Sequence, residues 1–230
     1  MRRREAITSM LAIGAASLTA GSTFFNVEAQ SSASSPYTFT TYTPLTYNFD
    51  GLKGLDKEML EQHYTLYKGY VTNVNKAQSV MMEMLSAGKA DTTEFSEVRR
   101  RISFEYAGMR LHEYYFEMLK PDGSAVDEKL KKAVSASWGT WENWVADITR
   151  TAMMRGIGWA ILYYDPVSKG LQNFWIDDHE NGNPPGFQPV FVLDVWEHAY
   201  VKQFGATGRR AYIDALMKNV DWSIVAKRLP

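Results

Sequence analysis

The heptapeptide DVWEHAY, which spans Asp194 to Tyr200, places a carboxylate and an imidazole four residues apart. The apolar run that precedes it, residues 189–193, is typical of a short buried strand. Two interpretations suit a generic Asp and His at this spacing. Asp194 is the N-cap of a helix with His198 one turn inside it, or both side chains converge on a metal ion at the end of the strand.

The composition restricts the kinds of site that the chain can build. Of its 230 residues, 45% are hydrophobic and 22% charged, as is usual for globular proteins. A net charge of -1 gives no electrostatic case for binding nucleic acid. The absence of cysteine excludes disulfides, thiolate metal sites and iron–sulfur clusters. A metal site must therefore use His, Asp and Glu, and the sequence has only four histidines.

Residues 1–29 have the pattern of an export signal. Arg2-Arg3-Arg4 precedes a mildly apolar stretch, and Val27-Glu28-Ala29 offers small residues for a signal peptidase. The apolar run is short and broken by polar residues, which favours a cleaved signal over a membrane anchor. The paired arginines indicate the twin-arginine route. We expect a periplasmic or extracellular protein, without stable membrane insertion after cleavage, in which residues 30–47 form an extended arm or linker.

Residues 48–120 predict an antiparallel helical hairpin. The first helix begins after an N-cap at Asp56 and runs to about Leu85, and the second runs from about Thr93 to Leu119. His63, Tyr67 and Tyr70 share one face of the first helix. A histidine and two tyrosines on one helix face are consistent with the core of a helical hairpin and equally with a functional site.

Residues 121–230 predict a mixed α/β domain. Helices are expected at residues 127–134, 141–153, 212–217 and 222–228, and strands at residues 156–164, 171–176 and 189–193. The predicted fold class is thus α+β, in which the N-terminal helical hairpin is followed by an α/β part with a three-stranded antiparallel sheet.

The DVWEHAY string closely resembles the signature of the iron/manganese superoxide dismutases. Residues 61–75 (EQHYTLYKGYVTNVN) and 111–116 (LHEYYF) resemble the two helical segments of that family, and the likeness covers about residues 43–229. It implies disproportionation of superoxide to O2 and H2O2 at one iron or manganese ion per subunit.

The resemblance implies four metal ligands, which are His63, His112, Asp194 and His198. The family spacing on the first helix is one residue longer and would place Gln62 in the ligand position. We expect His63 instead, because neutral imidazole is the better ligand. The helix then lacks a π-bulge that would absorb the extra residue.

The resemblance also assigns residues around the metal. Tyr70 would gate the site, and Trp159 and Trp196 would form apolar walls. His179 would take the place of a family glutamine that hydrogen-bonds the solvent ligand, because the helix position that often supplies this glutamine is the small Gly108. Competing candidates for this role are Asp178, Gln172 and, more distantly, Asn181.

The resemblance further implies that Glu197 bonds the ligand histidine of a neighbouring subunit across a two-fold axis, and hence a homodimer or higher oligomer. In the family, a second contact across the subunit interface joins a histidine of the first helix to a tyrosine. Both residues are replaced here, because position 201 is Val201 and the first helix offers Leu66 or Tyr67.

Two other functions remain alternatives. One is a catalytically altered metal-binding or interaction protein of the same fold. The other is an oxygenase with two histidines and one carboxylate, against which the third histidine argues.

Overall fold

The computed structural model describes residues 37–230. The expected export signal and the first residues of the arm lie outside the described residues. Within residues 37–230, no helix combines the length and the apolar character that a bilayer crossing requires.

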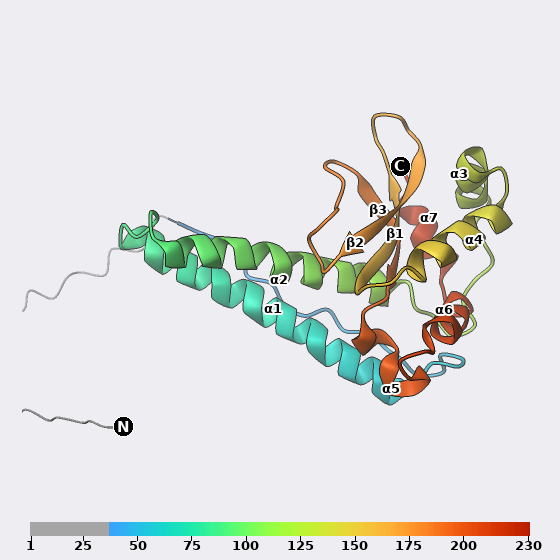
Figure 1. The fold of residues 1–230 in the computed structure, drawn as a ribbon, viewed down its shortest axis with the longest axis horizontal. Helices are drawn as coiled ribbons and strands as arrows, with labels where there is room; N and C mark the ends of the chain where they lie inside the picture. The colour runs from blue at the N-terminus through green and yellow to red at the C-terminus, as the bar shows by residue number, and fades with distance from the viewer. Residues whose placement is uncertain (1–36) are drawn as a thin grey trace, which may run out of the picture. The chain divides into compact units, whose positions relative to one another are not determined.

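Two long helices, α1 (Lys57–Ser86) and α2 (Thr93–Glu117), pack side by side as an antiparallel hairpin (Figure 1). The Asp56 carboxylate accepts the Met59 N–H at 2.8 Å and so caps α1, as predicted. Thr92 caps α2 in the same way through Phe95. The second helix ends two residues earlier than expected because Leu119 leaves it to form a bridge with Val220. The hairpin predicted from periodicity is confirmed.

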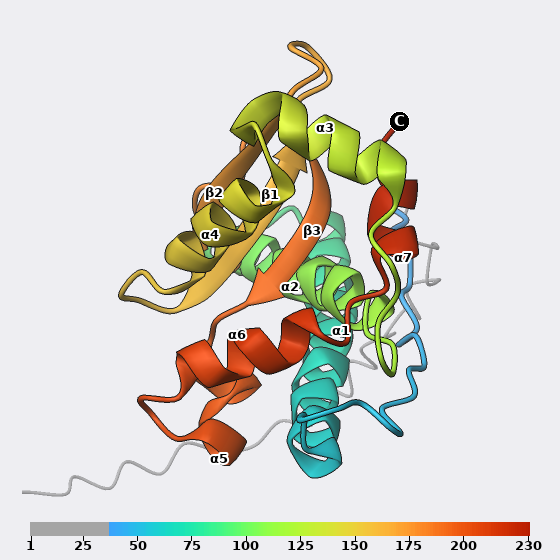
Figure 2. The same cartoon turned by 90° about the vertical axis from the view of Figure 1, so that its right-hand side faces the viewer.

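The second half contains a three-stranded antiparallel sheet, also as predicted. Its strands are β1 (Gly158–Tyr164), β2 (Leu171–Asp177) and β3 (Gln188–Asp194), in the order β2-β1-β3. Helix α4 (Trp141–Ala152) packs on β1 and β2, whereas α2 packs on β3. The sheet therefore lies between α4 and the hairpin (Figure 2). This arrangement brings the end of β3 against the buried faces of α1 and α2.

Several boundaries differ from the expected ones for local reasons. Helix α3 (Glu128–Trp138) runs four residues past the prediction and ends at Gly139, whose φ is +80°. Strand β1 begins two residues later, at Gly158. This position requires glycine, because its φ is +132° and a side chain there would run into the Ile176 carbonyl. The remaining helices are α6 (Arg209–Met217), which starts three residues early, and α7 (Trp222–Lys227).

Two short elements were not predicted. These are a 3-10 helix, η1 (Glu197–Ala199), and the single turn α5 (Val201–Phe204). Both follow β3 directly, so residues 194–200 leave the sheet through a tight turn and do not enter a regular helix. That turn places His198 back beside the end of β3.

Candidate metal centre

The four residues predicted as ligands lie together, with one nitrogen or oxygen atom of each within 4.8 Å of the others. His63 comes from α1, His112 from α2, Asp194 from the end of β3 and His198 from η1. The first three are fully buried, and the side chain of His198 is 19% exposed. The cluster thus joins the hairpin to the sheet.

The carboxylate of Asp194 divides its two oxygens between two tasks. Oδ1 accepts the Trp196 N–H at 2.8 Å and fixes the turn after β3. Oδ2 faces the three histidines, with Nε2 of His63 at 3.0 Å, of His198 at 3.3 Å and of His112 at 3.7 Å. The helix-cap interpretation of the heptapeptide is wrong, because η1 has Trp196 at its N-cap position and no side-chain capping bond. Oδ1 of Asp194 holds a turn instead, and Oδ2 points into the cluster.

The orientation of His112 leaves a lone pair aimed into the cluster. Its Nδ1 donates to the Gly108 carbonyl at 2.6 Å, so the proton of the neutral ring is on Nδ1. Its Nε2 is buried and has no hydrogen-bond partner among the described residues. A buried polar atom without a partner is costly, and a metal ion would satisfy this one.

The protonation states suit a cation. Burial lowers the pKa of His63 and lowers that of His112 well below its usual value, so both imidazoles stay neutral. Burial acts to raise the pKa of Asp194, but His198 and His63 outweigh it and hold this pKa far below its usual range. Three imidazole nitrogens and one ionised carboxylate form a donor set that fits a first-row transition metal such as iron or manganese.

The structure places His63, and not Gln62, in the cluster. His63 is fully buried, whereas Gln62 is exposed and lies 3.4 Å from Glu58. Every residue of Lys57–Ser86 is α-helical, so α1 contains no π-bulge. This is the register that the sequence led us to expect.

A second layer of side chains surrounds the cluster. Nε2 of His179 lies 2.8 Å from the Tyr70 hydroxyl, and the Trp159 indole donates to Nδ1 of His179 at 3.0 Å. The Trp196 ring stacks on His198 with centroids 5.6 Å apart and lies 4.8 Å from the His179 ring. The four residues predicted for this layer therefore meet around one side of the cluster.

Gly108 is small because its neighbours occupy the space that a side chain would need. A Cβ there would lie 2.8 Å from Tyr70 Cδ1 and 3.1 Å from His179 Cδ2. His179 is thus the candidate that fills this place. The other three do not, since Gln172 and Asn181 are exposed and Asp178 contributes its backbone carbonyl to the Trp196 indole.

Both polar groups of this layer are held in their neutral forms. Burial lowers the pKa of His179 to about 4. Burial, together with the charges of Asp194 and Glu105, raises the pKa of the Tyr70 hydroxyl well above its usual value. At neutral pH, His179 is an uncharged imidazole and Tyr70 carries its proton.

Sequence reasoning missed Phe104 and Arg101. The Phe104 ring lies 4.6 Å from the ring of His179, and the Arg101 guanidinium lies 4.4 Å from the Phe104 ring centroid. Arg101 is held by Glu105, which is almost fully buried. A signal was present, because Phe104, Gly108 and His112 are spaced at i, i+4 and i+8 on one helix face.

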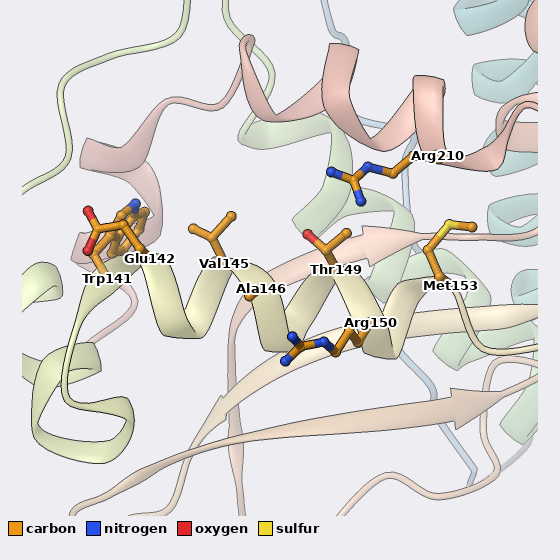
Figure 3. A pocket seen from close by; sticks show the side chains of 8 residues that line it. All are labelled: Trp141, Glu142, Val145, Ala146, Thr149, Arg150, Met153 and Arg210. Carbon is orange, nitrogen blue, oxygen red and sulfur yellow. The ribbon is translucent and has the colours of Figure 1, made fainter.

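A surface hollow of about 490 Å³ lies beside the cluster and is lined by Gln62, His63, Leu66, Glu197, His198, Val201 and Lys202. A groove of about 690 Å³ along α4 (Figure 3) is a different feature. Arg210 of α6 faces Thr149 across it, and none of the predicted site residues lines it.

Comparison with known proteins agrees with this geometry. Residues 38–120 match the alpha-hairpin domain of the iron/manganese superoxide dismutases, and residues 126–228 match their C-terminal domain. The manganese superoxide dismutase of Haloarcula marismortui is 33% identical over 187 residues, which cover 80% of this chain and 90% of the relative. The iron superoxide dismutase of Aquifex pyrophilus is 34% identical over 183 residues, with 77% and 85% covered. The chain belongs to the iron/manganese superoxide dismutase family.

Proposed function

We propose that this chain is a superoxide dismutase that holds one iron or manganese ion per subunit through His63, His112, Asp194 and His198. The observation that carries the proposal is the convergence of these four donor atoms, with the unpartnered Nε2 of His112 among them. The named relatives support the activity. They include both manganese and iron enzymes and therefore leave the choice of metal open.

The metal ion would supply the one-electron chemistry, by which one superoxide is oxidised to O2 and a second, with two protons, is reduced to H2O2. The protein contributes the surroundings. Neutral His63 and His112 with ionised Asp194 add only one negative charge to a metal cation. Tyr70 and His179 stand next to the cluster as groups that can hold and pass protons. Trp159 packs against the His112 ring and Trp196 against the His198 ring, so the two indoles would wall the cluster with apolar surface.

The experiment combines metal analysis with a superoxide-consumption assay on the purified chain and on His112→Ala. We expect about one equivalent of iron or manganese and superoxide consumption in the unaltered protein. In His112→Ala we expect at least about a tenfold loss of bound metal and activity. Thr72→Ala is the matched control on the exposed side of α1, away from the hollow beside His63, and should keep both. Bound metal without activity would instead favour an altered metal-binding protein, and activity that survives His112→Ala would refute the ligand assignment.

We infer that two copies of the chain associate through the hollow beside His63 and His198. Leu66 is 43% exposed there and Glu197 lies on its rim, so a partner would cover an apolar side chain and close the open side of the cluster. Glu197 is the group that would reach His198 of the other copy. Light scattering at micromolar concentration tests this inference. We expect a dimer that Glu197→Ala weakens, and a monomer in the unaltered protein would refute it.

We also propose that the chain is exported and that residues 1–29 are removed. The support is the basic, apolar and small-residue pattern of these residues. Mass spectrometry of the protein from its native cell should show a chain that begins near residue 30. A chain with Arg2-Arg3-Arg4 still attached would contradict the proposal.

A further inference from the structure

The hydrogen-bond network around His179 has a fixed direction. An indole N–H can only donate, so the Trp159 contact at 3.0 Å requires a lone pair on Nδ1 of His179. Trp159 and His179 are both fully buried, and solvent therefore does not compete for this bond. The proton of the neutral imidazole must lie on Nε2.

The Nε2–H group points at one acceptor. The Tyr70 hydroxyl lies 2.8 Å from Nε2, so the imidazole donates to the tyrosine oxygen. The opposite tautomer would place an N–H on Nδ1 against the indole N–H and would lose the Trp159 bond, while the Tyr70 hydroxyl would turn to donate to Nε2. The doubly protonated ring would meet the same conflict at Nδ1, which adds to the effect of burial in keeping His179 neutral.

The Tyr70 hydroxyl consequently has its own hydrogen left to donate. Among the described residues it has no hydrogen-bond partner besides His179, and its ring lies 5.1 Å from the ring of His112. The neutral His179 ring has a single N–H group, and this group donates its hydrogen bond to Tyr70. His179 therefore has no second hydrogen for a group bound in the cluster, and its influence must pass through the tyrosine.

We propose that Trp159 is a positioning residue that locks His179 in the Nε2–H tautomer, so that Tyr70 is the proton donor that faces the metal centre. The tautomer follows from the three side chains alone, whereas the role of Tyr70 in proton supply rests on the proposed function. Trp159 is thus more than an apolar wall, because its indole N–H sets the direction of the chain of hydrogen bonds.

The tautomer can be measured without any assay of activity. The imidazole ¹⁵N signals of the metal-free full chain, labelled at histidine, distinguish protonated from unprotonated nitrogens, and the His179 signals are assigned by their loss in His179→Gln. We expect the Nε2–H form to dominate. Trp159→Phe keeps the ring but removes the donor, and it should reduce the ratio of Nε2–H to Nδ1–H by about tenfold. A dominant Nδ1–H form in the unaltered protein, or an unchanged ratio in Trp159→Phe, would overturn the inference.

Trp144→Phe is the matched control. Trp144 is equally buried and its indole also donates to a side chain, Asn173 at 3.1 Å, but it does not contact His179. This variant should leave the ratio of the Nε2–H to the Nδ1–H tautomer of His179 unchanged. An equal change in both variants would show a non-specific effect and would refute the role of Trp159.

Neutron diffraction of the deuterated, metal-loaded protein gives a second test that needs no variant. We expect deuterium on Nε2 of His179 and a Tyr70 deuterium directed away from it. Deuterium on Nδ1, or a Tyr70 hydroxyl that points at His179, would overturn the inference. An Nε2–H tautomer in a protein without dismutase activity would refute the proposed function and leave the lock by Trp159 standing.

Discussion

At the scale of single residues, the site depends on side chains that serve the fold and the cluster together. Asp194 holds the turn after β3 with one oxygen and faces three imidazoles with the other. His112 likewise uses Nδ1 on the Gly108 carbonyl and keeps Nε2 for the cluster. Substitution of either residue therefore changes both local structure and the site.

Gly108 offers a prediction at this scale, because α1 contains a matched glycine. Gly108→Ala would push its Cβ against Tyr70 and His179, and we expect it to destabilise the protein by about 1–3 kcal/mol. Gly69→Ala has no atom within 4 Å of its new Cβ and should stabilise α1 by up to about 1 kcal/mol. Urea unfolding measures both variants. Equal changes in the free energy of unfolding for the two variants would show that the contacts with Tyr70 and His179 are not the reason why position 108 requires glycine.

Residue identities were predictable to different degrees. The four clustered residues followed from a string similar to a known family and from the scarcity of histidine. The choice of His63 over Gln62 needed a chemical argument, and the burial of the two residues agrees with it. The spacing puts Phe104 on the helix face of Gly108 and His112, but its contact with His179 depends on how α2 packs against the loop that carries His179. Arg101 reaches the site only through its contact with Phe104, so that packing decides its part as well.

At the scale of elements, long periodic segments were predictable and short ones were not. The hairpin and the three strands have apolar patterns several residues long. Neither η1 nor α5 has more than four residues, too few for a pattern to emerge. The start of α6 was missed because its N-cap, Gly208, makes no side-chain capping bond.

Asn219 supports a prediction about how elements are joined. Its fully buried amide accepts the Lys53 N–H at 2.8 Å and donates to the carbonyls of Lys53 and Ala215, so it ties the end of α6 to the loop before α1. Asn219→Ala should cost about 1–3 kcal/mol, because these backbone groups lose their partner. Urea unfolding measures this loss of stability, with Asn48→Ala as the control. Asn48 is exposed, and its substitution should cost less than about 0.5 kcal/mol.

At the scale of the whole molecule, the buried histidines predict how the metal-free protein responds to acid. The pKa of His179 is about 4 in the folded protein and 6.5 in the unfolded chain. Above pH 6.5 both states leave this ring neutral, and its contribution to stability is fully present. As the pH falls from 6.5 towards 4, only the unfolded chain binds the proton, and up to about 3 kcal/mol is lost. His63 and His112 shift in the same direction.

The measurement is the urea midpoint of the chelator-treated protein between pH 7 and pH 5. We expect the midpoint to fall over this range, and to fall less in His179→Gln, whose amide does not titrate. A flat profile in the unaltered protein would contradict the assignment of these buried imidazoles as neutral.

One carboxylate oxygen touches both halves of the molecule, since Oδ2 of Asp194 on the sheet faces His63 and His112 on the hairpin. An ion bound there would be a cross-link between segments 131 residues apart in the chain. Metal binding would then add to the contacts that already dock the two halves. At a free metal concentration a hundred times the dissociation constant, the ion would add about 2.7 kcal/mol to the free energy of unfolding. The melting temperature should therefore rise with the concentration of free metal, and it should do so even in a variant that binds the ion but no longer turns over superoxide.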